Sequence, residues 1–231
     1  MKIKSLLLGL SIVALTFGCK AGDPTRVSIL GDSYSTFEGC VSPKTNISWY
    51  LKVPKNNRTN VTKPSQTWWG ILCQDKDFVM EKNNSYSGST ICTTGYSNND
   101  YSDRAFISRI HDLGNPDVIL VFGGTNDAWA DSPMGEFKWG NWTERDLKSF
   151  RPAMAYMLDN MKTLYPDSKI IFLLNDGLKD VVNSSVKTVC ERYDVPVVEL
   201  KGIDKTNDHP NIRGMQQIAE QLKPVMQKVN K

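Results

Sequence analysis

Four runs of apolar residues, each followed by turn-forming residues, constrain the fold of this chain more than any other feature. The runs are continuous rather than alternating, which is typical of parallel strands covered on both faces. Longer patterns with helical spacing lie between and after the last three runs. Alternation of this kind predicts a three-layer α/β/α sandwich with about five parallel strands. The predicted strands occupy residues 27–30, 117–122, 169–174 and 195–200, and the predicted helices occupy residues 147–164, 179–193 and 214–229.

The first half of the chain carries shorter and weaker signals. Residues 68–73 predict a short amphipathic helix, residues 78–81 a weak strand, and residues 101–113 a helix closed by glycine and proline. Residues 41–65 are polar and contain three prolines, which indicates a long excursion without regular structure. No repeat, low-complexity tract or linker divides the sequence. We therefore expect residues 19–231 to form one domain.

The N-terminus has the pattern of an export signal. Lys2 and Lys4 precede an apolar run over residues 6–17, which is too short to span a membrane as a helix. The following Gly18 and Cys19 resemble the processing box of bacterial lipoproteins. That resemblance implies cleavage of a signal peptide over residues 1–18, lipidation of Cys19, and an exported protein of the cell envelope whose membrane contact is the lipid alone. The alternative is ordinary signal cleavage nearby, with Cys19 incidental.

Composition narrows the function further. The net charge is +3, and no basic run interleaved with aromatic residues is present, so we expect no nucleic-acid partner. Apart from Cys19, four cysteines remain, and in an exported protein they allow two disulfides with three connectivities. No CxxC pair occurs and the two histidines are far apart, so we expect no zinc or other metal site. The four cysteines are Cys40, Cys73, Cys92 and Cys190.

Polar turns follow two of the predicted strands, and two further polar segments complete a set of four. Because the carboxyl ends of parallel strands share one edge of a sheet, residues 31–33 (Gly-Asp-Ser) and 123–127 (Gly-Gly-Thr-Asn-Asp) should lie on the same edge. A glycine-containing loop over residues 83–90 lies between them in sequence. The segment Asp-His-Pro-Asn, residues 208–211, stands just before the last helix.

These four segments, in this order and at these places, resemble the four blocks of the SGNH, or GDSL-type, hydrolases over nearly the whole mature chain. The resemblance implies the flavodoxin-like fold of that family and a serine esterase that needs no cofactor. Ser33 would be the nucleophile and His209 the base that activates it. The oxyanion donors would be the backbone N–H groups of Ser33 and Gly88 and the side-chain amide of Asn126.

The third member of the triad departs from the family pattern. An aspartate is expected three residues before the histidine, but that position is Thr206. Asp204 could substitute, because residues two apart in an extended segment face the same side. Two alternatives are Asp208 and a Ser–His dyad in which a backbone carbonyl orients the imidazole.

Several aromatic residues suggest the kind of substrate. Trp129, Trp139 and Trp142 follow the Asn126 block and could stack on sugar rings, or they could simply pack a long loop onto the domain. Arg104 is either a substrate contact or a structural ion pair. We expect a small-molecule or glycan ester as substrate, most plausibly an acetylated carbohydrate. The alternatives are a lipase or lysophospholipase on the same site, and a glycan-binding protein without activity.

Overall fold

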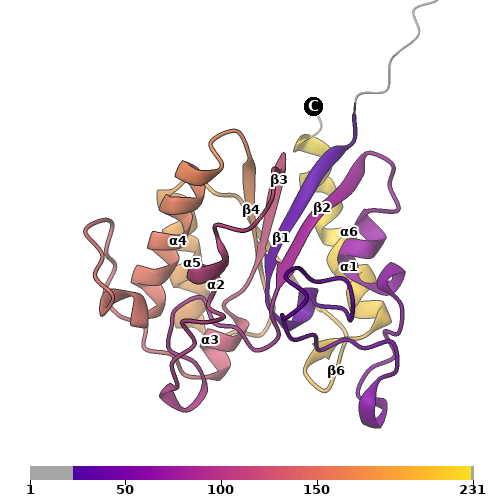
Figure 1. Cartoon of the computed structure of the whole chain (residues 1–231), viewed down its shortest axis with the longest axis horizontal. Coiled ribbons are helices and arrows are strands. Elements are labelled where there is room, and N and C mark those ends of the chain that lie inside the picture. Colours follow the sequence, from indigo (N-terminus) through magenta and orange to yellow (C-terminus); the bar gives the residue numbers. More distant parts are fainter. Residues whose placement is uncertain (1–22, 230–231) are drawn as a thin grey trace, which may run out of the picture.

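A five-stranded parallel sheet forms the centre of the computed structural model, which describes residues 23–229 (Figure 1). The strand order is β2-β1-β3-β4-β5, as in flavodoxin-like folds, and every neighbouring pair is parallel. The fold class expected from the sequence is therefore confirmed. The strands are β1 (Thr25–Gly31), β2 (Phe78–Ser85), β3 (Val118–Phe122), β4 (Lys169–Leu174) and β5 (Val197–Glu199).

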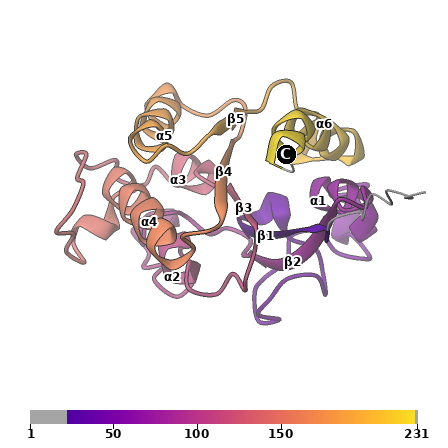
Figure 2. The same ribbon diagram turned by 90° about the horizontal axis from the view of Figure 1, so that it is seen from above.

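Helices cover both faces of this sheet. Figure 1 shows α1 and α6 on one side and α2, α4 and α5 on the other, and Figure 2 shows the same layers from above. The short helix α3 follows β3 at the carboxyl edge of the sheet. The bounds are α1 (Trp68–Leu72), α2 (Phe106–Arg109), α3 (Thr125–Trp129), α4 (Phe150–Leu164), α5 (Asp180–Arg192) and α6 (Ile212–Val229).

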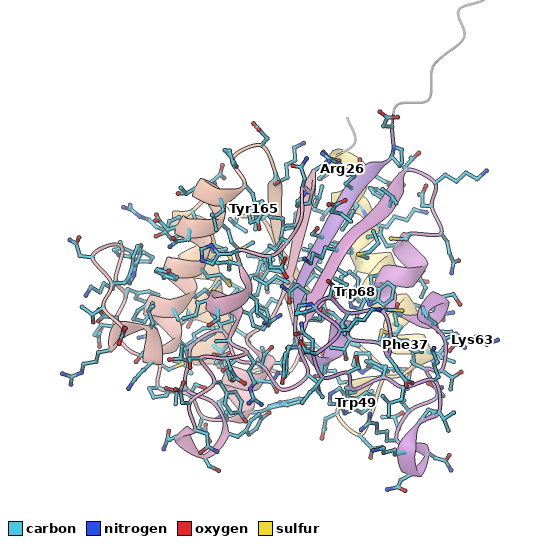
Figure 3. The ribbon with its side chains drawn as sticks, in the orientation of Figure 1. Arg26, Phe37, Trp49, Lys63, Trp68 and Tyr165 are labelled. Atoms are coloured by element: carbon cyan, nitrogen blue, oxygen red, sulfur yellow. The ribbon has the colours of Figure 1, made fainter. Side chains whose placement is uncertain are left out.

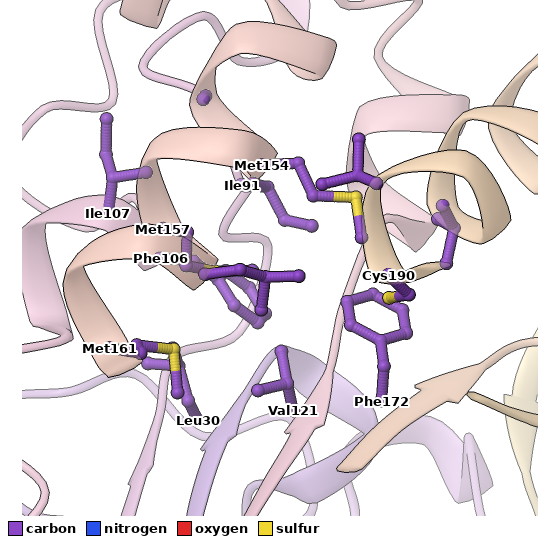
Figure 4. Packing of buried hydrophobic residues seen from close by; sticks show 14 of the residues in the cluster. Leu30, Ile91, Phe106, Ile107, Val121, Met154, Met157, Met161, Phe172 and Cys190 are labelled. Atoms are coloured by element: carbon purple, nitrogen blue, oxygen red, sulfur yellow. The ribbon is translucent and has the colours of Figure 1, made fainter. Parts of the chain in front are cut away.

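The hydrophobic core lies in two clusters, one on each face of the sheet. All five residues of β3 are buried, which explains why its sequence is apolar without alternation. On the face covered by α4 and α5, methionines of α4 pack over Val121 and Phe172 (Figure 4). Methionine is flexible enough to fill the irregular space between a twisted sheet and a helix. This packing fixes the strands whose ends carry the polar turns.

Two helices are shorter than the sequence predicts. In the predicted helix over residues 101–113 only α2 is α-helical, because Ala105 is non-helical, with a ψ of 153°, and the N–H of Phe106 donates to the carbonyl of Thr90. The helix expected over 147–164 begins at Phe150, because Ser149 is extended and follows a separate 3₁₀ turn. In both cases a contact of the loop overrides the local helical pattern.

The excursion after β1 is irregular, as predicted. Between residues 36 and 67 the only helical turns are two 3₁₀ turns, Lys55–Asn57 and Pro64–Gln66. Near the C-terminus a two-residue hairpin joins β6 (Lys205–Thr206) to β7 (His209–Pro210). Figure 3 shows Trp49 of the excursion at the end of the molecule opposite Arg26, which lies near the start of β1.

Three expectations from the sequence concern the export signal, the membrane and the cysteines. The expected signal peptide and Cys19 lie outside residues 23–229. Within that range no helix is long and apolar enough to cross a membrane. All four cysteines of the described chain are free thiols: Cys40 and Cys73 are half-buried, and Cys92 and Cys190 are buried.

Candidate active site

Ser33 begins a single 3₁₀ turn, Ser33–Ser35, directly after β1 and Asp32. The Asp32 carboxylate accepts a hydrogen bond from the N–H of Tyr34 at 3.0 Å and caps this turn. Gly31 is required by close packing, because a Cβ there would lie 2.6 Å from Oγ of Ser85 on β2. The N–H of Ser33 is at the first position of the turn, where no intrahelical acceptor exists.

The strand register brings the polar turns to one edge, as the sequence predicts. Gly31 is level with Ser85 of β2 and with Phe122 of β3. The residues that follow these three positions therefore leave the sheet side by side. They carry Ser33, the loop with Gly88, and Asn126.

His209 faces Ser33 from the other end of the sequence. Nε2 of His209 lies 3.0 Å from Oγ of Ser33, and both side chains are buried. Nδ1 of His209 lies 3.0 Å from the carbonyl oxygen of Asn207. Because a carbonyl only accepts, Nδ1 carries the proton of a neutral ring, and Nε2 is free to accept the serine proton. This is the geometry of a nucleophile and its general base.

No carboxylate touches the imidazole within residues 23–229, which corrects the expectation for Asp204. Oδ2 of Asp204 instead pairs with Nε of Arg213 at 3.2 Å, on α6. Asp208 offers its carbonyl oxygen to the phenol of Tyr34, and its side chain is exposed. The structure therefore presents the third alternative of the sequence analysis, in which a backbone carbonyl orients the ring.

The hairpin geometry creates that contact. Asn207 and Asp208 are its two central residues, with φ angles of 48° and 60°, as a two-residue hairpin turn requires. Thr206, where the family pattern has aspartate, pairs with His209 across the hairpin. The next residues begin α6, whose N-terminus is capped by Asn211 through a 3.0 Å bond from the N–H of Gly214. Asp208 therefore does not cap this helix.

Burial lowers the pKa of His209 to about 4, with the positive charge of Arg58 acting in the same direction. The carbonyl of Asn207 and the carboxylate of Asp208 act in the opposite direction. The imidazole is therefore neutral across the physiological range, which is the form that a general base needs.

The two further candidate oxyanion donors, Gly88 and Asn126, are connected by Ser89, which follows Gly88 and accepts a hydrogen bond from Asn126. Nδ2 of Asn126 donates to the carbonyl of Ser89 at 3.0 Å, and Oδ1 of Asn126 accepts from the phenol of Tyr96 at 2.8 Å. These two bonds fix the amide and leave its second N–H free. Gly88 has a φ of +80°, and within the described chain its N–H and that of Ser33 have no acceptor. Such unused donors at a buried nucleophile suit a developing oxyanion.

Asp127 holds the loop that contains these donors. Its carboxylate accepts hydrogen bonds from the N–H groups of Ile91 and Cys92 at 2.8 to 3.2 Å. Burial raises the pKa of Asp127 to about 6, although the two N–H donors favour its charged form. Asp127 thus braces the neighbouring loop rather than its own.

Arg109 is bonded to the residues next to the candidate nucleophile and oxyanion donors, and the sequence did not indicate it. Its buried guanidinium donates to the carbonyl of Gly31 at 3.2 Å and to Oγ of Ser89 at 2.9 Å, and it also binds the carbonyls of Asn84 and Arg104. Burial lowers the pKa of Arg109 to about 9 and raises that of nearby Asp32 to about 7. The sequence offers one weak indication of this role, which is that Arg109 lies among apolar residues in a short predicted helix.

Aromatic rings surround His209. Trp49 stacks on the imidazole with ring centroids 3.8 Å apart and planes 3° from parallel. The ring centroid of Trp129 lies 5.9 Å from that of His209, and this side chain is 41% exposed, so it can meet a substrate. The sequence singled out Trp129 but not Trp49, because the excursion that carries Trp49 has no recognisable pattern.

The remaining candidates lie against other parts of the fold. Arg104 forms a two-pronged ion pair with Asp103 and lies over the rings of Tyr86 and Tyr101. Trp139 stacks on Phe137 and lies beside Tyr193 after α5, and Trp142 packs on Tyr156 of α4. No group of three or more metal-binding side chains occurs between residues 23 and 229.

The chain matches the family model of GDSL-like lipase/acylhydrolases over residues 25–226. A crystal structure of a Bacteroides ovatus protein named for the GDSL-like lipases is 52% identical, with a TM-score of 0.87, and the match covers 89% of this chain and 99% of that one. A Bacteroides uniformis protein of the same name is 48% identical, with a TM-score of 0.86 and coverage of 89% and 96%.

More distant structures share the fold. One is a family two carbohydrate esterase from Clostridium thermocellum, which is 19% identical, with a TM-score of 0.59 and coverage of 89% of this chain and 64% of that one. No curated protein matches the chain. Because the family model spans almost all of the described residues, the chain belongs to the GDSL-like lipase/acylhydrolases and is an ester hydrolase.

Proposed function

We propose that this ester hydrolase is a serine esterase that removes an acetyl group from a carbohydrate. The observation that carries the serine mechanism is the 3.0 Å approach of Nε2 of His209 to Oγ of Ser33. Because Nδ1 donates its hydrogen to the carbonyl of Asn207, Nε2 is the ring nitrogen that can accept the proton of Ser33.

The reaction would proceed in two halves. Oγ of Ser33 attacks the carbonyl carbon while Nε2 of His209 takes the serine proton. The negative oxygen is bound by the N–H groups of Ser33 and Gly88 and by the amide of Asn126. Collapse breaks the ester bond, the alcohol leaves with the proton from His209, and water then attacks the acyl-serine in the same way.

The surroundings of the nucleophile support a small acyl group. Ser33 exposes only 3% of its surface, and the rings of Trp49 and Trp129 flank His209. A cavity of about 530 Å³ lies at the opposite edge of the sheet, between the C-terminal ends of α4 and α6 and away from Ser33. The exposed ring of Trp129 supports a carbohydrate leaving group, because sugars stack on aromatic faces.

We propose further that the protein is exported and tethered to the cell envelope by lipid on Cys19, without nucleic-acid partners. The support for export and the anchor is the sequence pattern of residues 1–19, and the support against nucleic-acid partners is a net charge of only +3 without a basic run interleaved with aromatic residues. Growth of a producing bacterium with labelled palmitate should label the wild type and not Cys19→Ser. Equal labelling of both proteins would contradict the anchor.

The first experiment compares hydrolysis of 4-nitrophenyl acetate, butyrate and octanoate by the wild type and by Ser33→Ala. We expect acetate to be preferred and the substitution to abolish activity. Labelling of the wild type, but not of the variant, by a fluorophosphonate would identify Ser33 as the nucleophile. Acetylated oligosaccharides are the next substrates to test.

Other outcomes would redirect the proposal. Preference for octanoate would favour a lipase on the same site. Equal rates for wild type and Ser33→Ala, together with no fluorophosphonate labelling, would contradict the serine mechanism and favour a protein that only binds glycans.

A further inference from the structure

Within the described chain, His209 lacks the carboxylate that orients the histidine of a Ser–His–Asp triad. Among residues 23–229, the one polar restraint on Nδ1 is the 3.0 Å contact with the carbonyl of Asn207, two residues earlier in the chain. A single hydrogen bond leaves an imidazole free to swing about its broad second side-chain torsion. A second restraint is therefore needed to keep Nε2 on Oγ of Ser33.

The ring of Trp49 supplies a contact of the required kind. The two rings lie face to face, with centroids 3.8 Å apart and planes 3° from parallel. A flat ring on one face of the imidazole blocks rotation out of the plane that contains Nδ1 and Nε2. The indole face is also electron-rich, so it attracts the imidazolium that forms when His209 accepts the serine proton.

Trp49 is itself fixed on several sides. The guanidinium of Arg58 lies 4.6 Å from the centroid of its ring and donates to its carbonyl oxygen. The N–H of Trp49 donates to Oγ1 of Thr36 at 2.9 Å, and that hydroxyl donates to the carbonyl of Ser33 at 2.9 Å. Through its backbone N–H, Trp49 is therefore tied to the nucleophile turn, and through its indole it contacts the base.

The same excursion is joined to the histidine hairpin. The phenol of Tyr50 donates to the carbonyl of Pro210 at 2.8 Å, and Nδ2 of Asn207 donates to the carbonyl of Arg58 at 3.0 Å. A further bond runs from the N–H of Ile212 to Oδ1 of Asn60 at 2.9 Å. The excursion and the hairpin thus form one unit on which Trp49 is presented to His209.

We propose that Trp49 is a positioning residue for the base, and that its stacked ring does for His209 what the missing triad carboxylate does elsewhere. This inference rests on the proposed serine mechanism. The stack holds Nε2 in line with Ser33 and favours the charged imidazolium as it forms.

The charged groups that face His209 set the background for any pH measurement. Arg58 and Lys205 disfavour the imidazolium, and Asp208 favours it. The phenols of Tyr34 and Tyr50 lie near the ring and are neutral, because burial raises the pKa of both. Replacement of Trp49 changes the identity of none of these five residues.

The test compares Trp49→Phe, which keeps an aromatic face, with Trp49→Leu, which keeps apolar volume without one. We expect Trp49→Leu to lower kcat between about 10-fold and 100-fold with little change in KM, because the base is misaligned rather than the substrate unbound. Trp49→Phe should restore most of the loss. In Trp49→Leu the acidic limb of the pH profile should move to lower pH, because the imidazolium loses the electron-rich ring that stabilises it while leucine keeps the apolar volume. Trp142→Leu, which removes a half-buried indole that packs on Tyr156 of α4, is the matched control.

A second readout does not depend on turnover. The chain has two histidines, so the ring protons of His209 and His111 are readily distinguished by NMR. Those of His209 should be shifted upfield by the indole in the wild type and in Trp49→Phe, but not in Trp49→Leu. Unshifted protons in the wild type, or an unchanged kcat and pH profile in Trp49→Leu, would overturn the inference. Equal activity of wild type and Ser33→Ala would instead overturn the serine mechanism, and the NMR comparison would still stand.

Discussion

His209 is the residue whose surroundings make the sharpest prediction about pH. With its pKa lowered to about 4 by burial, the neutral base persists down to that value, so kcat/KM should fall only as the pH drops through about 4. Thr206 pairs with His209 across the hairpin, so a carboxylate placed there lies beside the ring. Thr206→Asp should raise the pKa of His209, because a nearby negative charge favours the imidazolium.

The pH dependence of kcat/KM for the wild type, Thr206→Asp and the uncharged control Thr206→Asn checks this prediction. An acidic limb at the same pH in the two variants would show that an aspartate at 206 does not reach the imidazole.

Asn126 is the second residue with a measurable consequence. Asn126→Ala should lower kcat by about 10²–10³-fold, because one preorganised donor to the oxyanion is lost. Tyr96→Phe removes only the hydroxyl that donates to Oδ1 of Asn126, so it should lower kcat much less. Steady-state kinetics on 4-nitrophenyl acetate distinguishes the two. Equal losses would mean that Tyr96 does more than orient the amide.

The sequence indicated Ser33, His209 and Asn126 because each lies in a short block beside a recognisable strand or helix. It could not indicate Trp49 or the carbonyl of Asn207. Trp49 meets His209 across 160 residues, from a segment with no periodic pattern. The position of the Asn207 carbonyl depends on two positive φ angles in a hairpin turn. The two strands of that hairpin are only two residues long, which is too short for a recognisable sequence pattern.

At the scale of elements, Asp127 connects α3 to the loop after β2. Asp127→Ala should leave the buried N–H groups of Ile91 and Cys92 without acceptors, at a cost of about 1–3 kcal/mol for each group left unpaired. Activity should fall as well, because Gly88 lies in the same loop. Urea unfolding gives the stability change. Asp131→Asn, which removes an exposed charge paired with Lys179 and keeps a residue type that tolerates the φ of 52° there, should leave both properties unchanged.

Predictions of elements succeeded where packing and local pattern agree. The apolar runs of β3 and β4 mark fully covered strands, and both were located to within one residue. The helix expected over 101–113 was wrong in extent, because Thr90 captures the N–H of Phe106. That contact joins segments whose proximity no local pattern reveals.

For the whole molecule, the cluster under α4 and α5 should affect stability and not the chemistry. Phe172→Ala should lower the free energy of unfolding by about 3–5 kcal/mol, because Phe172 is fully buried between sheet and helices. The folded fraction should keep the wild-type kcat and pH profile, since β4 carries none of the proposed reacting groups. Denaturation with active-site titration separates the two effects. Leu164→Ala, at an exposed position, is the control.

The bond from the ring of His209 to the carbonyl of Asn207 has a consequence for genetics. Every residue carries a carbonyl, so no exchange of one side chain for another deletes this acceptor. A saturation screen of the chain for loss of activity would therefore identify Ser33 and His209 and find no third partner of their kind. Chemical synthesis could reach it: a thioamide at residue 207 weakens the acceptor while leaving every side chain in place. In this esterase the side chains determine the hairpin turn that orients the carbonyl of Asn207, but they do not supply the acceptor itself.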